Sequence, residues 1–264
     1  MILIFGGTSD SLVLAKALEE AGYDYILSVA TAYGKQLADQ KVKGTEENTS
    51  QARGEVIEGR LNLEGMKALI EAKHIQLILD ATHPYALEVS QNAMTVAEIM
   101  KVPYLRYERP SLLEAISKEH IHIVKDVQEA CEVANSLGKT IFLGTGSKTL
   151  GAFVKGLPNK KLIARVLPTS QVILECEALG LSPDNIVGMK GPFSEAINKA
   201  LYKHYGVECM ITKESGAEGG FLEKVRSCQE EGIEVIVIQR EALPYPKIAH
   251  TIDLVVKEVH QLLK

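Results

Sequence analysis

The sequence predicts an α/β protein built from two Rossmann-like, doubly wound parallel-sheet domains. Short apolar strands alternate with helical segments along all 264 residues, which is the pattern of βαβ units in a parallel sheet. A glycine-containing turn follows an early strand in each half, at residues 6–7 and 144–146. Domains typically span about 100–200 residues, so we expect two, at 1–115 and 116–264, with the active site in the cleft between them.

In the first half, Ile2–Phe5 and Tyr25–Val29 are predicted strands, and the helix Ser9–Ala21 between them ends at Gly22. The polar stretch Gly44–Gly59 has little periodicity and predicts no element. Later helices and strands are predicted at Leu63–Lys73, Ile75–Leu79, Ser90–Lys101 and Pro103–Arg106.

The second half repeats the alternation from about residue 125, after a linker between Arg109–Pro110 and Asp126. Its last helix is expected at about Asp253–Leu262. Its strands are predicted at Thr140–Leu143, Leu162–Val166, Ile186–Met189, Cys209–Thr212 and Glu234–Ile238.

Composition excludes several classes of protein. A net charge of −5 argues against a nucleic-acid-binding protein, which needs a basic face. No apolar run approaches the roughly 20 residues of a membrane-spanning helix, and the chain enters a strand at once, without a signal sequence. Four cysteines stand apart without metal-ligand spacing. We expect a cytoplasmic protein without a metal site.

The first turn is a candidate phosphate site. Gly6 and Gly7 allow close approach of a pyrophosphate to the backbone, and the helix that follows offers unpaired N–H groups. Thr8 or Ser9 can cap that helix and also bond a phosphate oxygen. The dinucleotide fingerprint is incomplete because Ser11 replaces its third glycine, so a simple tight connection is an equal alternative.

The end of the second strand does not decide between the two nicotinamide dinucleotides. An NAD site places an acid here for the ribose, whereas an NADP site needs basic or hydroxyl groups. Ser28 and Thr31 occupy this region and fit neither pattern strongly.

Residues 80–86 follow a predicted buried strand, where ligands of open α/β sheets collect. The loop carries Asp80, Thr82, His83 and Tyr85, and Pro84 keeps His83 out of helical geometry. His83 is a candidate general acid because an imidazole titrates near neutrality. The alternative is that Asp80 caps a turn and His83 only bonds it.

Further loops are suited to anions. Arg106 and Arg109 are guanidinium groups that match carboxylates, unless they form an exposed basic edge paired with Glu108. In the second half, residues 191–194 precede a helix that carries Asn198. The loop 212–221 combines Lys213 with hydroxyls and glycines and is an anion cradle by composition, with a flexible linker as the alternative.

Together these loops resemble the precorrin-6A reductase family of cobalamin biosynthesis, including its cobalt-precorrin branch. The similar segments occur in the expected order over nearly the whole chain. They are residues 6–8, Gly59-Arg60-Leu61, 80–86 with Asn92-Ala93, 104–110, 191–194 and 212–216.

The resemblance implies an NAD(P)H-dependent oxidoreductase that reduces the C18–C19 double bond of precorrin-6A, or of its cobalt complex. It implies a nicotinamide site on domain 1–115 and a polycarboxylate corrinoid between the domains, to which 116–264 contributes. The cofactor-binding residues are then Gly6, Gly7, Thr8, Ser9, Asp10, Ser28, Thr31, Asp80 and Thr82. The substrate-binding residues are Arg60, Arg106, Arg109, Ser194, Lys213, Ser215 and Gly216, with Arg165 and Lys190 as further basic groups near the cleft.

For proton donation, the candidates are His83, Tyr85 and Lys213, with solvent as an alternative. The family's first helix usually reads Glu-Ala-Arg where this chain has Asp10, Ser11 and Leu12. Loss of that arginine leaves NADH or NADPH open and slightly favours NADH. Near the end, the usual basic-proline pair reads Arg240-Glu241.

Two other functions are compatible with the residues. One is a tetrapyrrole or nucleotide-sugar transferase or synthase with two α/β domains and no redox cofactor. The other is a nucleotide-sensing module without catalysis. The sequence leaves the oligomeric state undetermined.

Overall fold

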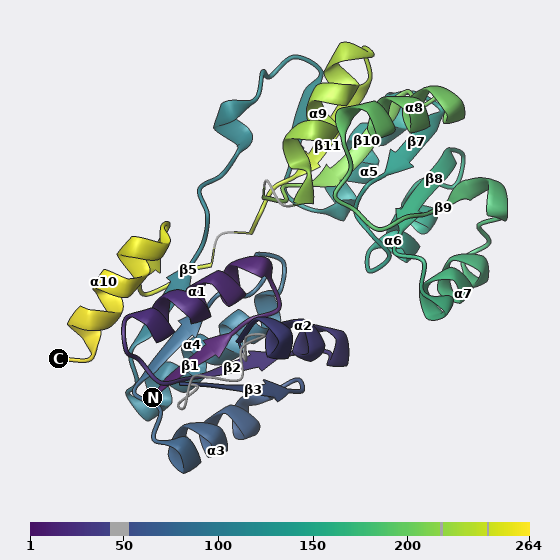
Figure 1. Cartoon of the computed structure of the whole chain (residues 1–264). Coiled ribbons are helices and arrows are strands. Elements are labelled where there is room, and N and C mark those ends of the chain that lie inside the picture. The colour runs from purple at the N-terminus through teal and green to yellow at the C-terminus, as the bar shows by residue number, and fades with distance from the viewer. Residues whose placement is uncertain (43–52, 217–218, 242) are drawn as a thin grey trace. The chain divides into compact units, whose positions relative to one another are not determined.

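The computed structural model describes residues 1–42, 53–216, 219–241 and 243–264, and Figure 1 shows its helices and strands. It divides into two compact units. Unit 1 comprises residues 1–110 and 242–264, and unit 2 comprises residues 111–241.

Unit 1 contains a six-stranded, all-parallel sheet in the order β12-β5-β4-β1-β2-β3. Helix α10 packs on α1, since both contribute to one core cluster, and Figure 1 shows them near each other. The elements are β1 Ile2–Phe5, α1 Ser9–Glu20, β2 Tyr25–Val29, α2 Ala32–Val42, β3 Gly54–Glu58, α3 Leu63–Lys73, β4 Leu77–Asp80, α4 Leu87–Met100, β5 Tyr104–Tyr107, β12 Ile248–Ala249 and α10 Ile252–Leu262.

Unit 2 contains a second six-stranded parallel sheet, in the order β6-β11-β10-β7-β8-β9. Its elements are the 3-10 helix η1 Leu113–Ala115, β6 Ile121–Val124, α5 Val127–Ser136, β7 Thr140–Leu143, α6 Leu150–Gly156, β8 Lys161–Val166, α7 Ser170–Ala178, η2 Pro183–Asn185, β9 Ile186–Gly188, α8 Glu195–Tyr205, β10 Cys209–Lys213, α9 Phe221–Glu230 and β11 Glu234–Ile238.

The central strands of both sheets are buried on both faces, as the continuous apolar runs predict. In β1, Ile2 and Ile4 belong to one core cluster, whereas Leu3 and Phe5 belong to the cluster on the other face. Ile141 and Phe142 of β7 divide in the same way between two clusters of unit 2. Successive side chains of a strand point to opposite faces, so each sheet is covered by helices on both sides. The predicted fold class is confirmed.

The two sheets have the same strand order. In each sheet, the edge strand beside β5 or β11 is formed by a segment that the chain reaches after crossing from the other unit. Next to β5 lies β12, which the chain reaches only after completing unit 2. Next to β11 lies β6, which directly follows the exit from unit 1.

The expected domains 1–115 and 116–264 therefore need correction. The first crossing lies at residues 110–111, and residues 242–264 return to unit 1. Val255 and Val259 of α10 are fully buried there with Leu14 and Leu18 of α1. Periodicity predicts an amphipathic helix, but it does not say which sheet that helix covers.

Several short or polar elements were missed by the sequence patterns. Strand β3 lies at the edge of its sheet with only intermediate or exposed residues, so its apolar signal is weak. It falls within the stretch 44–59, of which residues 44–52 lie outside the described residues. Edge strands β6 and β12 and helix α2 were also not predicted; β12 has only two residues.

Candidate active site

The first turn lies between the central strand β1 and helix α1, at the carboxyl edge of the unit 1 sheet. Gly7 has a φ of +107°, and a Cβ added there would meet nothing within 4 Å. A Cβ on Gly6, by contrast, would lie 2.6 Å from Leu27 Cδ1. Gly6 is therefore required for packing, whereas Gly7 leaves the backbone open to a ligand.

The hydroxyl groups of Thr8 and Ser11 stabilise this turn through hydrogen bonds to the backbone. Thr8 Oγ1 accepts a hydrogen bond from Ser11 N at 3.1 Å and donates to Ala81 O at 3.0 Å. Ser11 Oγ donates to Thr8 O at 2.7 Å and accepts from Gly7 N at 3.3 Å. Ser11 thus stabilises the turn in place of the glycine of the fingerprint, and Thr8 caps α1 and ties the turn to the loop after β4.

Asp10 lies in the first turn of α1 and forms an ion pair with Arg109, which follows β5. Arg109 thereby neutralises a carboxylate beside the helix N-terminus, where a negative phosphate is expected to bind. Both residues were predicted to contact ligands. The structure also gives them this mutual contact.

The predicted ribose region has one buried and one exposed hydroxyl residue. Ser28 is only 5% exposed within β2, which leaves little surface for a cofactor. Thr31 is exposed, and its Oγ1 accepts from Gly34 N at 3.1 Å in the first turn of α2. Arg60 is also exposed, just beyond the end of β3.

Asp80 has no exposed area and is the centre of a buried polar network at the end of β4. Its Oδ1 accepts from Arg106 Nη1 at 2.8 Å, from Thr82 N at 3.0 Å and from Thr82 Oγ1 at 2.7 Å. Its Oδ2 accepts from Tyr104 OH at 2.6 Å. Burial alone would raise the pKa of Asp80, but Arg106 and the surrounding hydroxyls lower it overall. The carboxylate is therefore ionised and paired.

Arg106 belongs to this network and not to an exposed surface. Its side chain has no exposed area, and the Tyr245 ring lies 5.1 Å from the guanidinium carbon. Direct contact with substrate, and the alternative of an exposed edge paired with Glu108, both conflict with this burial. A strand end with Arg looks the same in sequence whether the side chain faces solvent or a buried carboxylate.

His83 and Tyr85 leave the network and reach the surface of the loop. His83 is exposed and Tyr85 half-buried, with their ring centroids 5.7 Å apart. His83 Nδ1 accepts from Tyr85 N at 3.3 Å, so the neutral ring carries its proton on Nε2. Asp80 does form a turn with Thr82 N, and its carboxylate also accepts hydrogen bonds from Arg106, Tyr104 and Ser90.

Arg165, near the carboxyl end of β8 in unit 2, is a buried cation of a different kind. It is 7% exposed, and burial lowers its pKa. Its Nη1 donates to Asn198 Oδ1 at 2.7 Å, and its guanidinium carbon lies 4.2 Å from the Phe193 ring centroid. In the part of the chain that the structure describes, no carboxylate forms an ion pair with it.

Lys224, in the first turn of α9, is a second buried cation near Arg165. It is 7% exposed, and its Nζ donates to Ser215 Oγ at 3.3 Å. Burial lowers its pKa to about 8, the charge of Arg165 contributes, and Glu223 opposes the shift. Within the described ranges it too forms no ion pair. The sequence reasoning missed Lys224 because a lysine in an amphipathic helix normally faces solvent.

The loop after β10 contains the other predicted groups of unit 2. Lys213 is half-buried, and burial together with Lys148 lowers its pKa. A Cβ on Gly216 would meet nothing within 4 Å. Ser194 caps α8 through Ile197 N at 3.4 Å. Helix α9 begins at Phe221, directly after this loop, while residues 217–218 of the loop lie outside the described residues.

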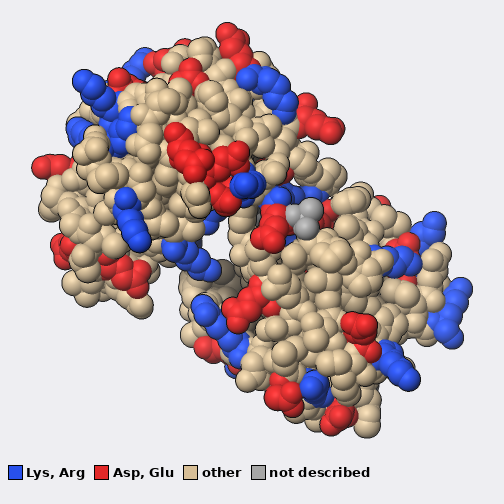
Figure 2. All heavy atoms as spheres, turned by 180° about the vertical axis from the view of Figure 1, so that it is seen from behind, with Lys and Arg blue, Asp and Glu red and all other residues tan. Residues whose placement is uncertain are grey.

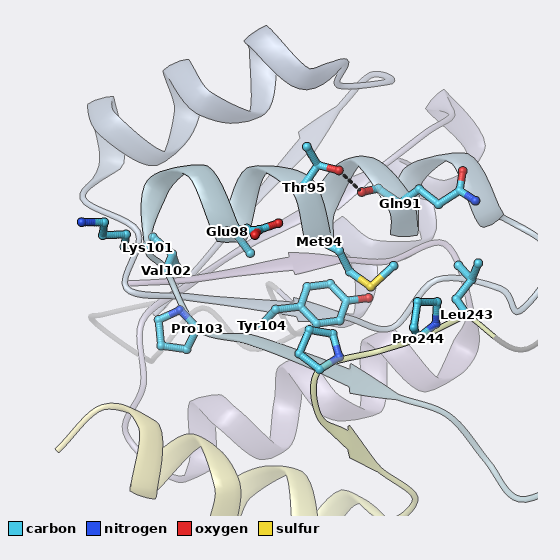
Figure 3. Close-up of a pocket in the computed structure, with 12 residues that line it drawn as sticks. Gln91, Met94, Thr95, Glu98, Lys101, Val102, Pro103, Tyr104, Leu243 and Pro244 are labelled. Atoms are coloured by element: carbon cyan, nitrogen blue, oxygen red, sulfur yellow. Dashed lines mark hydrogen bonds between the residues drawn. The ribbon is translucent and has the colours of Figure 1, made fainter.

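A pocket of about 780 Å³ lies elsewhere in unit 1, between α4 and the returning segment 243–246 (Figure 3). In this view the Tyr104 ring lies beside Met94, with Pro244 and Leu243 to their right. Its described lining includes none of the predicted site residues. It flanks the sheet and does not lie at the carboxyl edge.

The remaining surface offers few other candidates. Lys and Arg alternate with Asp and Glu over the face seen in Figure 2. In the described ranges, no group of three or more His, Cys, Asp or Glu side chains could hold a metal ion. None of the described helices is both long and apolar enough to cross a membrane.

The shared strand order and the glycine turn beside a central strand define a two-unit Rossmann-like α/β protein. This protein belongs to the precorrin-6x reductase family CbiJ/CobK, whose sequence model matches residues 1–260. The resemblance inferred from the loop motifs is thereby confirmed.

Two relatives illustrate the similarity. The chain is 39% identical over 239 residues to the cobalt-precorrin-6A reductase of Salmonella typhimurium, covering 90% of this chain and 87% of that protein. It is 38% identical over 262 residues to that of Priestia megaterium, covering 97% and 96%. The solved structure of CobK precorrin-6A reductase has the same fold, with a TM-score of 0.78, 22% identity and coverage of 99% and 96%.

Proposed function

We propose that this protein is a nicotinamide-dependent oxidoreductase that reduces the C18–C19 double bond of cobalt-precorrin-6A, or of precorrin-6A, in corrin ring synthesis. Within the fold and family established above, the observation that carries the proposal is the pair of buried cations, Arg165 and Lys224. They form no ion pair with a carboxylate of the described chain. A polycarboxylate corrinoid would supply the missing negative charge.

The first turn fits a dinucleotide. The open backbone at Gly7 and the N-terminus of α1 would hold the pyrophosphate, and Ser9 and Asp10 lie in the first turn of that helix. A bound nicotinamide supplies the hydride, and the protein contributes binding and orientation. Thr8, with its hydroxyl engaged in the cap, acts through the shape of the turn.

We propose that NADH serves at least as well as NADPH. Leu12 replaces the arginine expected from the family pattern and packs against the core, so it offers no charge to a 2′-phosphate. The exposed Thr31 is the remaining hydroxyl near the ribose position. Steady-state kinetics with both cofactors test this, and a large preference for NADPH would contradict it.

On the substrate side, Arg165 and Lys224 would bind carboxylates, with Lys213, Ser215 and Gly216 beside them. His83, Tyr85 and Lys213 remain the candidates for proton delivery, since each lies at a carboxyl edge with exposed or half-buried atoms. The positions of Arg60, Arg109 and Ser194 in the substrate site, the location of that site between the units and the cytoplasmic location stay predictions.

Anaerobic turnover tests the proposal. Cobalt-precorrin-6A and precorrin-6A are each incubated with NADH or NADPH, and oxidation of the nicotinamide is followed by absorbance. We expect the nicotinamide to be oxidised only when one of the two corrinoids is also present. A transferase or synthase without a redox cofactor would show no thermal shift with either nucleotide. A nucleotide-sensing module would show the shift but no oxidation.

A further inference from the structure

Each sheet carries an acid–arginine pair at the carboxyl ends of the same two neighbouring strands. In unit 1, Asp80 ends β4 and pairs with Arg106 of the neighbouring strand β5. In unit 2, β10 and β11 take the places of β4 and β5, and Glu214 follows β10 while Arg240 follows β11. Glu214 and Arg240 also form an ion pair. Each pair therefore joins the same two strand ends of its own sheet.

Glu214 and Arg240 contact each other through side chains and backbone. Arg240 N donates to Glu214 Oε2 at 3.3 Å, and Arg240 Nε donates to Glu214 O at 3.3 Å. Arg240 Nε also lies 3.6 Å from Glu214 Oε1, and Glu214 N donates to Ile238 O at 2.9 Å. Glu214 is only 3% exposed. A buried carboxylate without its cation is strongly unfavourable, so Arg240 restrains this segment.

The restrained residue lies between two groups that face the proposed substrate. Lys213 precedes Glu214 and Ser215 follows it, with Ser215 N donating to Lys213 O at 2.7 Å. Ser215 Oγ in turn accepts from Lys224 Nζ at 3.3 Å. Any movement that lets water reach Glu214 would displace Lys213 and Ser215 on either side of it.

We propose that Glu214 and Arg240 are positioning residues that hold Lys213 and Ser215 in their binding conformation. Asp80 and Arg106 play the equivalent part for Thr82 and the His83 loop of unit 1. This inference rests on the proposed function for its effect on catalysis. Its structural part, the restraint of loop 213–216, can be measured without substrate.

The test compares Arg240→Met, Arg240→Lys and Glu214→Gln in the full chain. Hydrogen–deuterium exchange of peptides covering 209–216 reports the loop, and kcat and KM for the corrinoid report the site. We expect faster exchange at 213–216 in Arg240→Met and at least a tenfold lower kcat/KM. Arg240→Lys restores part of both, because its charge remains. Nucleotide-induced thermal shifts stay unchanged, because the first turn lies in unit 1.

Arg226→Met is the matched control, since this arginine of α9 is 58% exposed in its side chain and pairs with Glu195 at 3.9 Å. It should change neither exchange nor kinetics. Unchanged exchange in Arg240→Met would overturn the inference, whether or not activity falls, because Arg240 would then act by direct contact or not at all. If the unmodified chain lacks reductase activity, the proposed function fails, while the exchange result still decides the restraint.

Discussion

Units 1 and 2 have the same strand order, but the buried arginine of each unit has a different kind of partner. Arg106 donates to the carboxylate of Asp80, and the pair is fully buried. Arg165 donates to the neutral amide of Asn198 and lies against aromatic rings. A cation neutralised inside the fold holds the fold together, whereas a cation without a counter-charge can bind an anion from outside. We therefore propose a structural role for Arg106 and a ligand-binding role for Arg165.

The first turns show a second difference. After β1, Gly7 precedes the 12-residue helix α1, which Thr8 caps. After β7, Gly146 has a φ of +77° with open space around it, but α6 has only seven residues. A longer, capped helix presents a better-ordered set of N–H groups to a phosphate. We therefore propose that the dinucleotide binds at unit 1.

The largest expected effect comes from removing each arginine. Arg106→Met leaves the Asp80 carboxylate buried without a partner and should lower the free energy of unfolding of unit 1 by about 3–5 kcal/mol. Arg165→Met should lower the free energy of unfolding of unit 2 by only about 1–3 kcal/mol, because the Asn198 oxygen is left without a donor. It should instead weaken corrinoid binding by about tenfold to a hundredfold.

Chemical denaturation and equilibrium binding measure the two effects. Equal losses of stability in both variants would remove the distinction between the arginines. Undiminished corrinoid affinity in Arg165→Met would remove Arg165 from the substrate site.

Gly7→Ala and Gly146→Ala sharpen the comparison of the turns. Both glycines have positive φ, so each substitution should cost a similar amount of about 1–2 kcal/mol. Only Gly7→Ala should also weaken nucleotide binding, by roughly a hundredfold, because a side chain would stand where the pyrophosphate approaches. Nucleotide-induced thermal shifts give the answer. Loss of the shift in Gly146→Ala alone would place the cofactor in unit 2.

The smallest effect is a pH dependence of unit 2. Lys224 has a pKa of about 8 when folded and about 10.4 when unfolded. Between these values the unfolded state binds more protons, so the stability conferred by this group rises with pH. Corrinoid affinity should fall severalfold over the same range, because the ammonium loses its charge.

Lys224→Met should make the pH dependence of stability and of corrinoid affinity less steep, measured by denaturation and binding from pH 7 to pH 10. Lys203→Met is the control, since the Lys203 side chain is 68% exposed, and it should leave both slopes unchanged. Parallel slopes of stability and affinity in the unmodified protein would contradict the assignment of Lys224.

The sequence by itself determined the fold class, the parallel sheets and the loops that carry polar groups. Buried parallel strands are continuous apolar runs, and the turns after them need glycine or capping residues. Strands and turns can therefore both be recognised from short stretches of sequence. Helix Leu63–Lys73 was predicted with its bounds, and ordered loop motifs identified the family. These features depend on neighbours along the chain.

Only the tertiary structure decided which polar side chains face one another. Arg106 and Asp80 are 26 residues apart in sequence, yet form one buried pair, and Lys224 turns inward on a helix that also carries solvated charges. The return of residues 242–264 to unit 1 likewise depends on which sheet has an unfilled edge. Charge compensation and edge pairing are long-range properties. Local pattern therefore located the loops of this protein, while the packing of both sheets decided which buried cations are paired with a carboxylate and which are not.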